Sequence, residues 1–267
     1  AVGEYGHIIY SDDRGATWTQ AKNVPTRNTI TSVTFLDDKT GFAVGHDATI
    51  LKSEDAGESW SLKYIERAGE NPLFGLQFSS TTYGVAVGAF STVMETKDGG
   101  ETWAQRPLIE DGYDDFHLNG LFRDTSGNLY IPAEFGLVYK SKDGGRTFAA
   151  IQTAYEGSFW GGMALANNNL LIWGMRGNAY VSRDNGRSWV RSETNTDQSI
   201  SGGTQLANGT ILLTGLSGLV LVSKDNGRTF DANVRADRLS FATVSSKSDG
   251  EVLLYGDPGV LSHELAN

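Results

Sequence analysis

Six copies of one eight-residue pattern constrain the fold of this chain more than any other feature of its sequence. The pattern is Ser/Thr-x-Asp-x-Gly-x-Ser/Thr-aromatic, and its clearest copy runs from Ser182 to Trp189. The other copies are residues 11–18, 53–60, 96–103, 141–148 and 223–230. Their closing aromatic residues recur every 41–45 residues, a period that is typical of propellers and solenoids.

The residue types of this octapeptide indicate a tight turn. An aspartate in such a turn accepts hydrogen bonds from nearby backbone N–H groups, and the glycine supplies a positive φ. The closing Trp or Phe offers a large apolar face that is best buried against a neighbouring repeat. Because a ligand site would not recur six times at one spacing, we interpret the octapeptides as structural Asp-box turns. The aspartates assigned this role are Asp13, Asp55, Asp98, Asp143, Asp184 and Asp225.

The segments between the octapeptides predict four short strands in each repeat. In the second repeat these strands are expected near 30–35, 41–44, 49–53 and 59–64, where β-branched and aromatic residues alternate with polar ones. No segment has the periodicity of an amphipathic helix. Four antiparallel strands in about forty residues form the blade of a β-propeller. The sequence therefore predicts an all-β, seven-bladed propeller of four-stranded blades, with residues 1–267 as one domain.

The first and the last of these seven blades are expected to be incomplete. The opening fragment lacks its first strand and the closing fragment lacks its fourth, so we expect upstream residues to be missing from this sequence. A six-bladed ring, in which the two end fragments form one blade, is the alternative. It is disfavoured because residues 7–11 and 260–264 would compete for the same third-strand position.

Composition excludes several classes of function. The net charge is −10, and no basic stripe is present that could meet the phosphates of a nucleic acid. Cysteine is absent, which rules out thiolate metal sites and cysteine nucleophiles. No apolar segment is long enough to span a membrane. His46 and His117 have no neighbouring pattern of metal ligands, so neither a metal nor a cofactor is expected.

The residue sequences of the predicted strands also resemble those of a known family. The segments Ala43-Val44-Gly45 and Gly84 to Gly88, each followed by an octapeptide, resemble the photosystem II stability/assembly factor-like family of BNR/Asp-box propellers. The segment from Tyr155 to Gly162 is similar to the branch found in non-photosynthetic proteobacteria. The resemblance implies a non-catalytic, exported propeller, periplasmic or in the thylakoid lumen of a phototroph. It also implies binding to a membrane-protein complex or to a subunit of an export transporter, and we expect a monomer.

The binding residues are expected on the face opposite the octapeptides. The turns between second and third strands and the loops between fourth and first strands lie on that face, and variable loops on a rigid scaffold usually carry the binding residues. Aromatic residues mixed with arginine are frequent anchors of protein interfaces. The residues predicted to bind are His46, Arg67, Phe90, Glu134, Phe135, Tyr155 and Arg176. For Arg176, an ordinary ion pair with Glu134 is an equally good interpretation, and the acidic segment 110–115 is more often a solvated loop than a docking segment.

Two alternatives to protein binding remain open. Sialidases share the octapeptide, and their chemistry needs an arginine cluster, a tyrosine activated by a glutamate and an aspartic acid. Tyr155, Glu156, Glu134 and Asp111 could supply some of these groups, with Arg27, Arg67 and Arg176 as the cations. A carbohydrate-binding propeller is the other alternative, favoured only if aromatic side chains form an exposed platform. Because the catalytic set is incomplete, the sequence predicts a protein that is not an enzyme.

Overall fold

The chain divides into two compact units of β-structure. The computed structural model describes residues 1–67, 69, 71–109, 115–248 and 250–265. The first unit comprises Ala1–Phe122, Gly127–Ile131 and Lys140–Ala149, and the second comprises Arg123–Ser126, Pro132–Tyr139 and Ala150–Asn267. Whether residues 1–267 behave as one domain stays a prediction.

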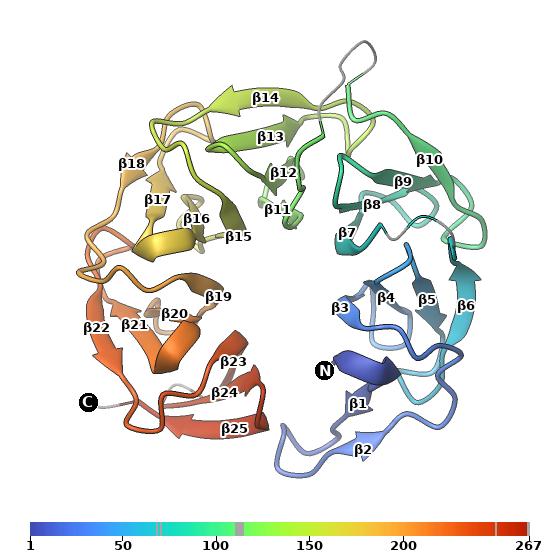
Figure 1. Ribbon diagram of the computed structural model, residues 1–267, viewed down its shortest axis with the longest axis horizontal. Coiled ribbons are helices and arrows are strands. Elements are labelled where there is room, and N and C mark those ends of the chain that lie inside the picture. The colour runs from blue at the N-terminus through green and yellow to red at the C-terminus, as the bar shows by residue number, and fades with distance from the viewer. Residues whose placement is uncertain (68, 70, 110–114, 249, 266–267) are drawn as a thin grey trace. The chain divides into compact units, whose positions relative to one another are not determined.

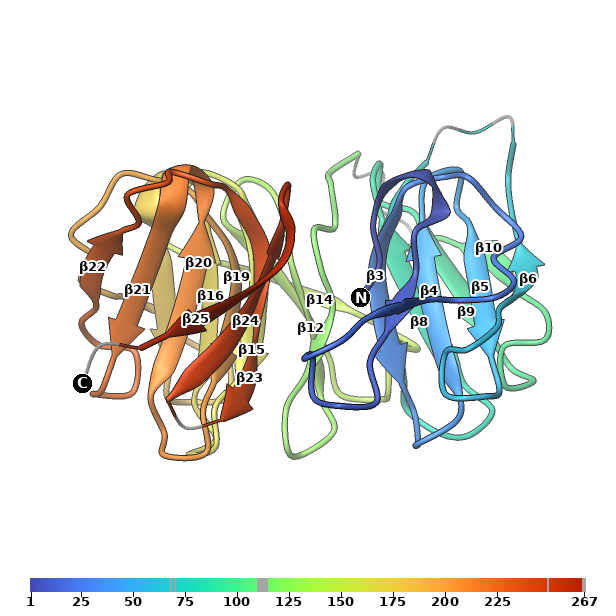
Figure 2. The same cartoon turned by 90° about the horizontal axis from the view of Figure 1, so that it is seen from below.

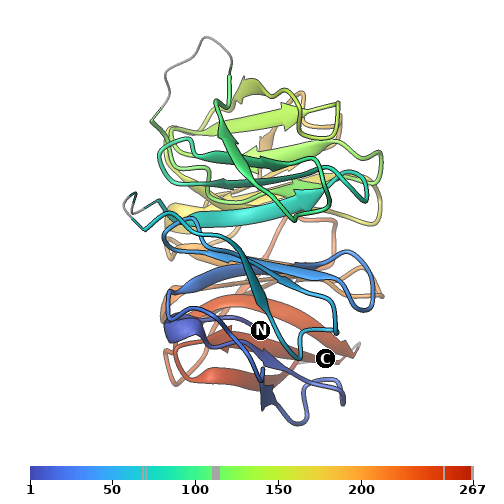
Figure 3. The same ribbon diagram turned by 90° about the vertical axis from the view of Figure 1, so that its right-hand side faces the viewer.

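The first unit contains a two-stranded ribbon and two four-stranded antiparallel sheets (Figure 1). The ribbon pairs β1 (Ile9–Tyr10) with β2 (Thr19–Gln20). The first sheet contains β3 (Ile30–Phe35), β4 (Gly41–Gly45), β5 (Ile50–Ser53) and β6 (Ser61–Tyr64). The second contains β7 (Leu73–Phe78), β8 (Gly84–Gly88), β9 (Val93–Thr96) and β10 (Ala104–Arg106). Figure 3 shows the blue strands of the first sheet stacked beside the teal strands of the second.

The next sheet shares its residues between the units, and the second unit contains three more. The shared sheet contains β11 (Phe122–Arg123), β12 (Leu129–Pro132), β13 (Leu137–Ser141) and β14 (Ala149–Gln152). It is followed by β15 (Phe159–Ala164), β16 (Leu170–Gly174), β17 (Ala179–Ser182) and β18 (Val190–Arg191). Then come β19 (Ile200–Gln205), β20 (Ile211–Gly215), β21 (Leu219–Ser223) and β22 (Asp231–Val234), which Figure 2 shows in spatial order. The last sheet has three strands, β23 (Phe241–Ser248), β24 (Glu251–Gly256) and β25 (Gly259–Glu264).

The prediction of seven blades is wrong, because the described residues form six sheets of three or four strands. The opening repeat contributes only the ribbon β1–β2 around its octapeptide, and Val2 adds no more than an isolated bridge to Ile8. Two strands of two residues each bury too little surface to make a blade. The closing repeat does form a blade, of three strands. The ribbon and this last sheet are separate sheets, so the six blades do not arise by merging the two end fragments.

In each four-stranded sheet burial is greatest in the second strand and least in the fourth. Every residue of the second strands β4, β8, β12, β16 and β20 is buried, as expected for strands covered on both faces. The fourth strands are much more exposed, and every residue of β22 is exposed. The apolar cores therefore lie between neighbouring sheets. Phe42, Leu76 and Trp103 belong to such a core in the first unit, and Leu171, Leu213 and Phe230 belong to one in the second.

Among the described residues three short turns have the hydrogen-bond pattern of a 3₁₀ helix, although their central residues have positive φ. These turns are η1 (Glu4–Gly6), η2 (Met175–Gly177) and η3 (Leu216–Gly218). η2 and η3 connect the second strand of a repeat to the third, and η1 occupies the corresponding place before β1.

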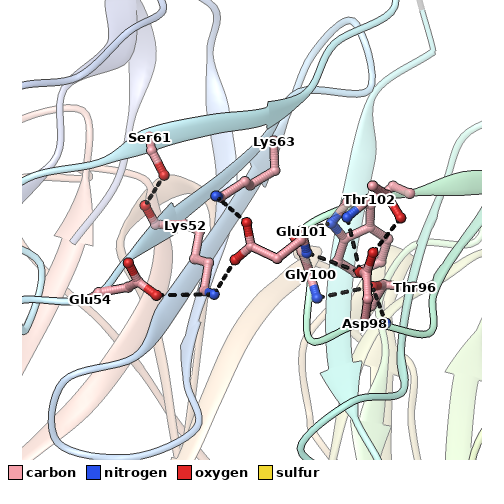
Figure 4. Close-up of polar contacts among 10 residues, drawn as sticks. Lys52, Glu54, Ser61, Lys63, Thr96, Asp98, Gly100, Glu101 and Thr102 are labelled. Carbon is pink, nitrogen blue, oxygen red and sulfur yellow. Dashed lines mark hydrogen bonds and ion pairs between the residues drawn. The ribbon is translucent and has the colours of Figure 1, made fainter.

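Ion pairs join the first two sheets at the octapeptide between them. The Glu101 carboxylate, which follows Asp98 and Gly100 in the third octapeptide, accepts from Lys52 Nζ at 2.6 Å and from Lys63 Nζ at 2.7 Å (Figure 4). Both lysines belong to the preceding sheet, on β5 and β6. The octapeptide therefore contacts its neighbouring repeat as well as closing its own hairpin.

Candidate functional site

The carboxylates of the six octapeptide aspartates accept hydrogen bonds from groups of their own turns. In the copy at Ser182–Trp189, Asp184 Oδ1 accepts from the Ser188 N–H and the Ser182 hydroxyl, both at 2.9 Å. Asp184 Oδ2 accepts from the Ser188 hydroxyl at 2.6 Å. Equivalent bonds surround Asp13, Asp55, Asp98, Asp143 and Asp225. These contacts support a structural role for the turns, and that role is tested by substitution below.

The same hydrogen bonds favour the ionised form of these carboxylates. The bond from the Ser188 hydroxyl is the largest of the causes that lower the pKa of Asp184 to about 2. The equivalent threonine hydroxyls lower the pKa of Asp13 and of Asp98 to about 2. A carboxylate held in this way at neutral pH has no proton to give, so these aspartates do not suit general acid chemistry.

The turns between second and third strands share a second, less expected geometry. In six of them the two central residues both have positive φ, as in the type I′ turns that fit the twist of a β-hairpin. We call these segments the type I′ turns: Glu4–His7, His46–Thr49, Ala89–Thr92, Glu134–Leu137, Met175–Asn178 and Leu216–Leu219. In each, the carbonyl of the first residue accepts from the N–H of the fourth.

In five of the six type I′ turns the first central position is occupied by a residue that rarely adopts this conformation. Asn, Asp and Gly are usual there, but this chain has Tyr5, Phe90 and Phe135 with φ of 53°, 52° and 54°. A left-handed conformation costs about 1 kcal/mol for a residue with a side chain. Nor does burial offset that cost, because these side chains are 75%, 51% and 58% exposed. These three turns therefore combine backbone strain with exposed aromatic surface.

Four of the predicted binding residues lie together in the second unit. The segment 152–157 connects two type I′ turns: Thr153 Oγ1 donates to the Gly136 carbonyl at 2.9 Å, and the Tyr155 hydroxyl donates to the Met175 carbonyl at 3.3 Å. Glu134 and Phe135 belong to the first of these turns, and Arg176 belongs to the second. The Phe135 and Arg176 side chains are exposed. This cluster therefore combines an aromatic ring with a cation.

The Tyr155 side chain packs against two buried aromatic rings. Its ring lies 5.2 Å from the Phe159 ring and 6.0 Å from the Tyr180 ring, and the residue is half-buried. Burial raises its pKa. A sialidase nucleophile would need a carboxylate partner and a more acidic hydroxyl, whereas this hydroxyl donates to a backbone carbonyl. Tyr155 is therefore not activated in the way that this chemistry requires. Asp111 of the predicted catalytic set, and most of the acidic segment 110–115, lie outside the described residues.

The other three predicted residues belong to the first unit. His46 is the first residue of a type I′ turn. The Asn28 side chain stabilises this turn by donating a hydrogen bond to the His46 carbonyl at 3.3 Å. Arg67 is exposed, and its loop reaches this turn through a bond from the Glu66 N–H to the Asp47 carbonyl at 2.8 Å. The Phe90 ring packs against the His117 ring, with the ring centres 5.0 Å apart.

Sequence analysis missed two residues of this first-unit surface. Tyr5, the most exposed large hydrophobic residue described, occupies the same turn position as Phe90 but was not among the predicted binding residues. His117 was considered only as a metal ligand. Among the described residues no group of three or more His, Asp or Glu side chains could hold a metal ion. No helix in the described part of the chain is both long and apolar enough to cross a bilayer.

The sheets and their connections define the class of this protein, which is a β-propeller built from four-stranded antiparallel blades. The WD40 β-propeller domain of Doa1 has a similar structure, with a TM-score of 0.53 at 15% identity, over 88% of this chain and 92% of that one. The chain belongs to the family described as photosynthesis system II assembly factor YCF48, whose sequence model matches residues 11–73 and 68–196.

Solved structures of YCF48 proteins have the same fold. One, of YCF48 bound to a D1 peptide, has a TM-score of 0.72 at 20% identity, over 90% of this chain and 79% of that one. Another, YCF48 from Cyanidioschyzon merolae, has a TM-score of 0.65 at 17% identity, over 86% of this chain and 80% of that one. No curated protein sequence matches the chain.

Proposed function

We propose that this protein is a non-catalytic assembly or accessory factor that binds a segment of a membrane-protein complex through its type I′ turns. The observation that carries the proposal is the exposed aromatic side chain at a strained position in three of these turns. Natural sequences keep such strain where it serves recognition. Membership of the YCF48 family supports the same role, since one relative is described as bound to a peptide.

The binding residues that we assign are the seven predicted ones together with Tyr5. Phe90, Phe135 and Tyr5 supply apolar contact area, and Arg67 and Arg176 supply charge-assisted hydrogen bonds to the partner. The net charge of −10 favours a partner surface that is neutral or basic away from these arginines. We propose that the protein acts as a monomer outside the cytoplasm, in the periplasm or, in a phototroph, in the thylakoid lumen. The partner belongs to a membrane complex or an export transporter.

Substitution by asparagine tests the binding role without endangering the fold. Asparagine is well suited to the first central position of a type I′ turn, so Phe90→Asn, Phe135→Asn and Arg176→Asn should each fold at least as well as the parent. Ser217→Asn is the matched control, because it changes the same turn position without removing an aromatic ring or a cation.

The assay is recovery of membrane proteins from detergent-solubilised membranes by the immobilised protein. We expect the parent and Ser217→Asn to recover the same membrane protein, and the triple variant to recover about tenfold less. Equal recovery by the triple variant, with an unchanged melting temperature, would refute the assignment of this surface. Recovery of no membrane protein, together with hydrolysis or binding of a sialoside or a glucan, would favour the carbohydrate alternatives instead.

A further inference from the structure

Two neighbouring octapeptides of the second unit carry four exposed basic side chains. Arg183 and Arg187 are the second and sixth residues of one octapeptide, and Lys224 and Arg228 occupy the same positions of the next. All four residues are exposed. None of the ion pairs between described residues involves any of the four. We call these four residues the basic patch.

Packing between repeats brings the two octapeptides together. The Ser192 hydroxyl, three residues beyond the first octapeptide, donates to the Gly227 carbonyl of the second at 2.6 Å. A parallel bridge pairs Glu193 with Thr229, and the Glu193 N–H donates to the Arg228 carbonyl at 2.9 Å. The two pairs of cations lie 41 residues apart in the sequence, so the fold forms a patch where the sequence has no continuous basic run.

The sixth octapeptide position has a structural use in the first unit. There the Glu101 carboxylate binds Lys52 and Lys63 of the preceding sheet (Figure 4). The Arg146 guanidinium, at the same position one repeat later, lies 4.3 Å from the centre of the Tyr83 ring. Both side chains therefore contact the preceding repeat, whereas the exposed cations of the basic patch are available to a partner.

The acidic side chains beside the basic patch leave it positively charged. Asp184 and Asp225 direct their carboxylates into their own turns, where hydroxyl and N–H groups bind them. Glu193 adjoins Arg228 but forms no ion pair with it in the described structure. The four cations outnumber these three acidic groups, although the whole chain carries −10. Charges more than about 8 Å away are largely screened at physiological ionic strength, so the local excess decides what binds.

The residues around the basic patch favour a lipid surface over a protein partner. Protein interfaces are centred on large aromatic anchors, but Phe230 is 1% exposed and Trp189 is half-buried. Val190 is 59% exposed, and valine is under-represented among such anchors. Clusters of about four to eight Lys and Arg side chains bind anionic lipids. Because lipid headgroups diffuse, long basic side chains on turns can reach them without a fixed complementary shape.

We propose that the basic patch docks the protein on an anionic lipid bilayer, with its guanidinium and ammonium groups donating to phosphate oxygens of the headgroups. β17 and β21 each run from a type I′ turn to an octapeptide of this patch. The docked protein therefore directs these type I′ turns away from the bilayer. The basic patch shares no residue with the type I′ turns, so this inference stands or falls independently of the proposed function.

Co-sedimentation with lipid vesicles tests the proposal without any partner protein. The probe is a vesicle of phosphatidylcholine with about 30% phosphatidylglycerol, and vesicles of phosphatidylcholine alone are the reference. We expect the protein to bind only the anionic vesicles. Salt at about 1 M, where the screening length is about 3 Å, should abolish the binding. This comparison uses the unmodified protein, so it does not depend on how any variant folds.

Neutralising the sixth positions identifies the basic patch as the docking surface. The double variant Arg187→Gln with Arg228→Gln removes two cations and keeps the backbone and hydroxyl bonds of both turns. Each basic side chain near an anionic bilayer strengthens binding about fivefold, so we expect this variant to bind about 25-fold more weakly. Arg14→Gln with Lys39→Gln is the matched control, since it removes the same charge from exposed positions of the first unit.

The control should bind like the parent, and Arg187→Lys with Arg228→Lys should retain binding because a bilayer requires only the charge. Equal binding by the glutamine variant and its control would overturn the proposal. So would equal binding to the two kinds of vesicle, or no binding to the anionic ones. Binding of a soluble oligoglutamate peptide through the same arginines, without vesicle binding, would overturn it as well, because the occupant would then be an acidic polypeptide.

Discussion

Replacing one octapeptide aspartate tests whether these turns stabilise the fold. In Asp184→Ala the carboxylate disappears, and with it the bonds from the Ser188 N–H, the Ser188 hydroxyl and the Ser182 hydroxyl. The Ser188 N–H then has only water as a partner. Ser182 itself is fully buried, and its hydroxyl still accepts from the Gly186 N–H at 2.7 Å. The loss is therefore local to one corner of the hairpin.

Two estimates of the magnitude agree. Three hydrogen bonds at about 1 kcal/mol each give roughly 3 kcal/mol. The pKa of Asp184, lowered from 3.8 to about 2, corresponds to roughly 2.5 kcal/mol of preference for the ionised form. Both figures must be discounted because solvent reaches the carboxylate. We therefore expect Asp184→Ala to lower the free energy of unfolding by about 2 kcal/mol at pH 7.

The contribution of Asp184 should disappear in acid. Because the folded pKa lies below the unfolded value, the stabilisation is fully present above pH 3.8 and is lost as the pH falls through about 2. Denaturant unfolding of parent and variant at pH 7 and at pH 2 measures the difference, and exchange of the Ser188 amide measures it locally. The difference between the two proteins should narrow markedly at pH 2.

An exposed aspartate outside the octapeptides provides the control. Asp231 on β22 is exposed, and Asp231→Ala should change stability by less than about 0.5 kcal/mol at either pH. The reasoning fails if Asp184→Ala is as stable as Asp231→Ala at pH 7. It fails equally if the deficit of Asp184→Ala is the same at pH 2 as at pH 7.

Two further predictions concern the second unit. A β-carbon at Gly136 would lie 1.6 Å from the Tyr155 carbonyl oxygen, so Gly136→Ala should lower the free energy of unfolding by about 3 kcal/mol, measured by thermal unfolding. Gly209 also has a positive φ but has open space around it, so Gly209→Ala should lower that free energy by only about 1 kcal/mol. Equal losses of stability in the two variants would contradict the close approach at Gly136. Burial lowers the pKa of His263 below 6.5, and Arg235, whose Nη1 lies 2.9 Å from His263 Nδ1, lowers it further. Stability should therefore fall as the pH drops below 6.5, and the fall should be absent in His263→Gln; an NMR titration midpoint at or above 6.5 would contradict this.

The repeat predicted most of the local structure correctly, because it reports on short-range physics. The strands expected at 30–35 and 41–44 appear as Ile30–Phe35 and Gly41–Gly45, since β-branched and aromatic runs between turn residues favour strands wherever they are buried. The type I′ turns were not predicted. Apart from Asp47, their first central residues, such as Phe90, are not the Asn, Asp or Gly usual at this position, and hairpin twist imposes the conformation.

The number of blades could not be predicted from the sequence, for a related reason. A repeat can be recognised from one octapeptide, but a blade requires several strands to pair and bury one another. The opening repeat has the octapeptide around Asp13 and forms only the β1–β2 ribbon. The position of Tyr155 illustrates the same limit. Sequence placed it in a binding loop, and only the structure shows that its ring is half-buried and that its hydroxyl bonds to the Met175 carbonyl of the next turn.

By itself the sequence determined where the chain turns and which stretches become strands, because hydrogen bonds and backbone preferences within about eight residues decide both. Tertiary structure alone decided how many sheets are completed and which aromatic side chains, like that of Phe135, remain exposed to solvent. Those outcomes depend on packing between repeats some forty residues apart, and no local pattern records that packing.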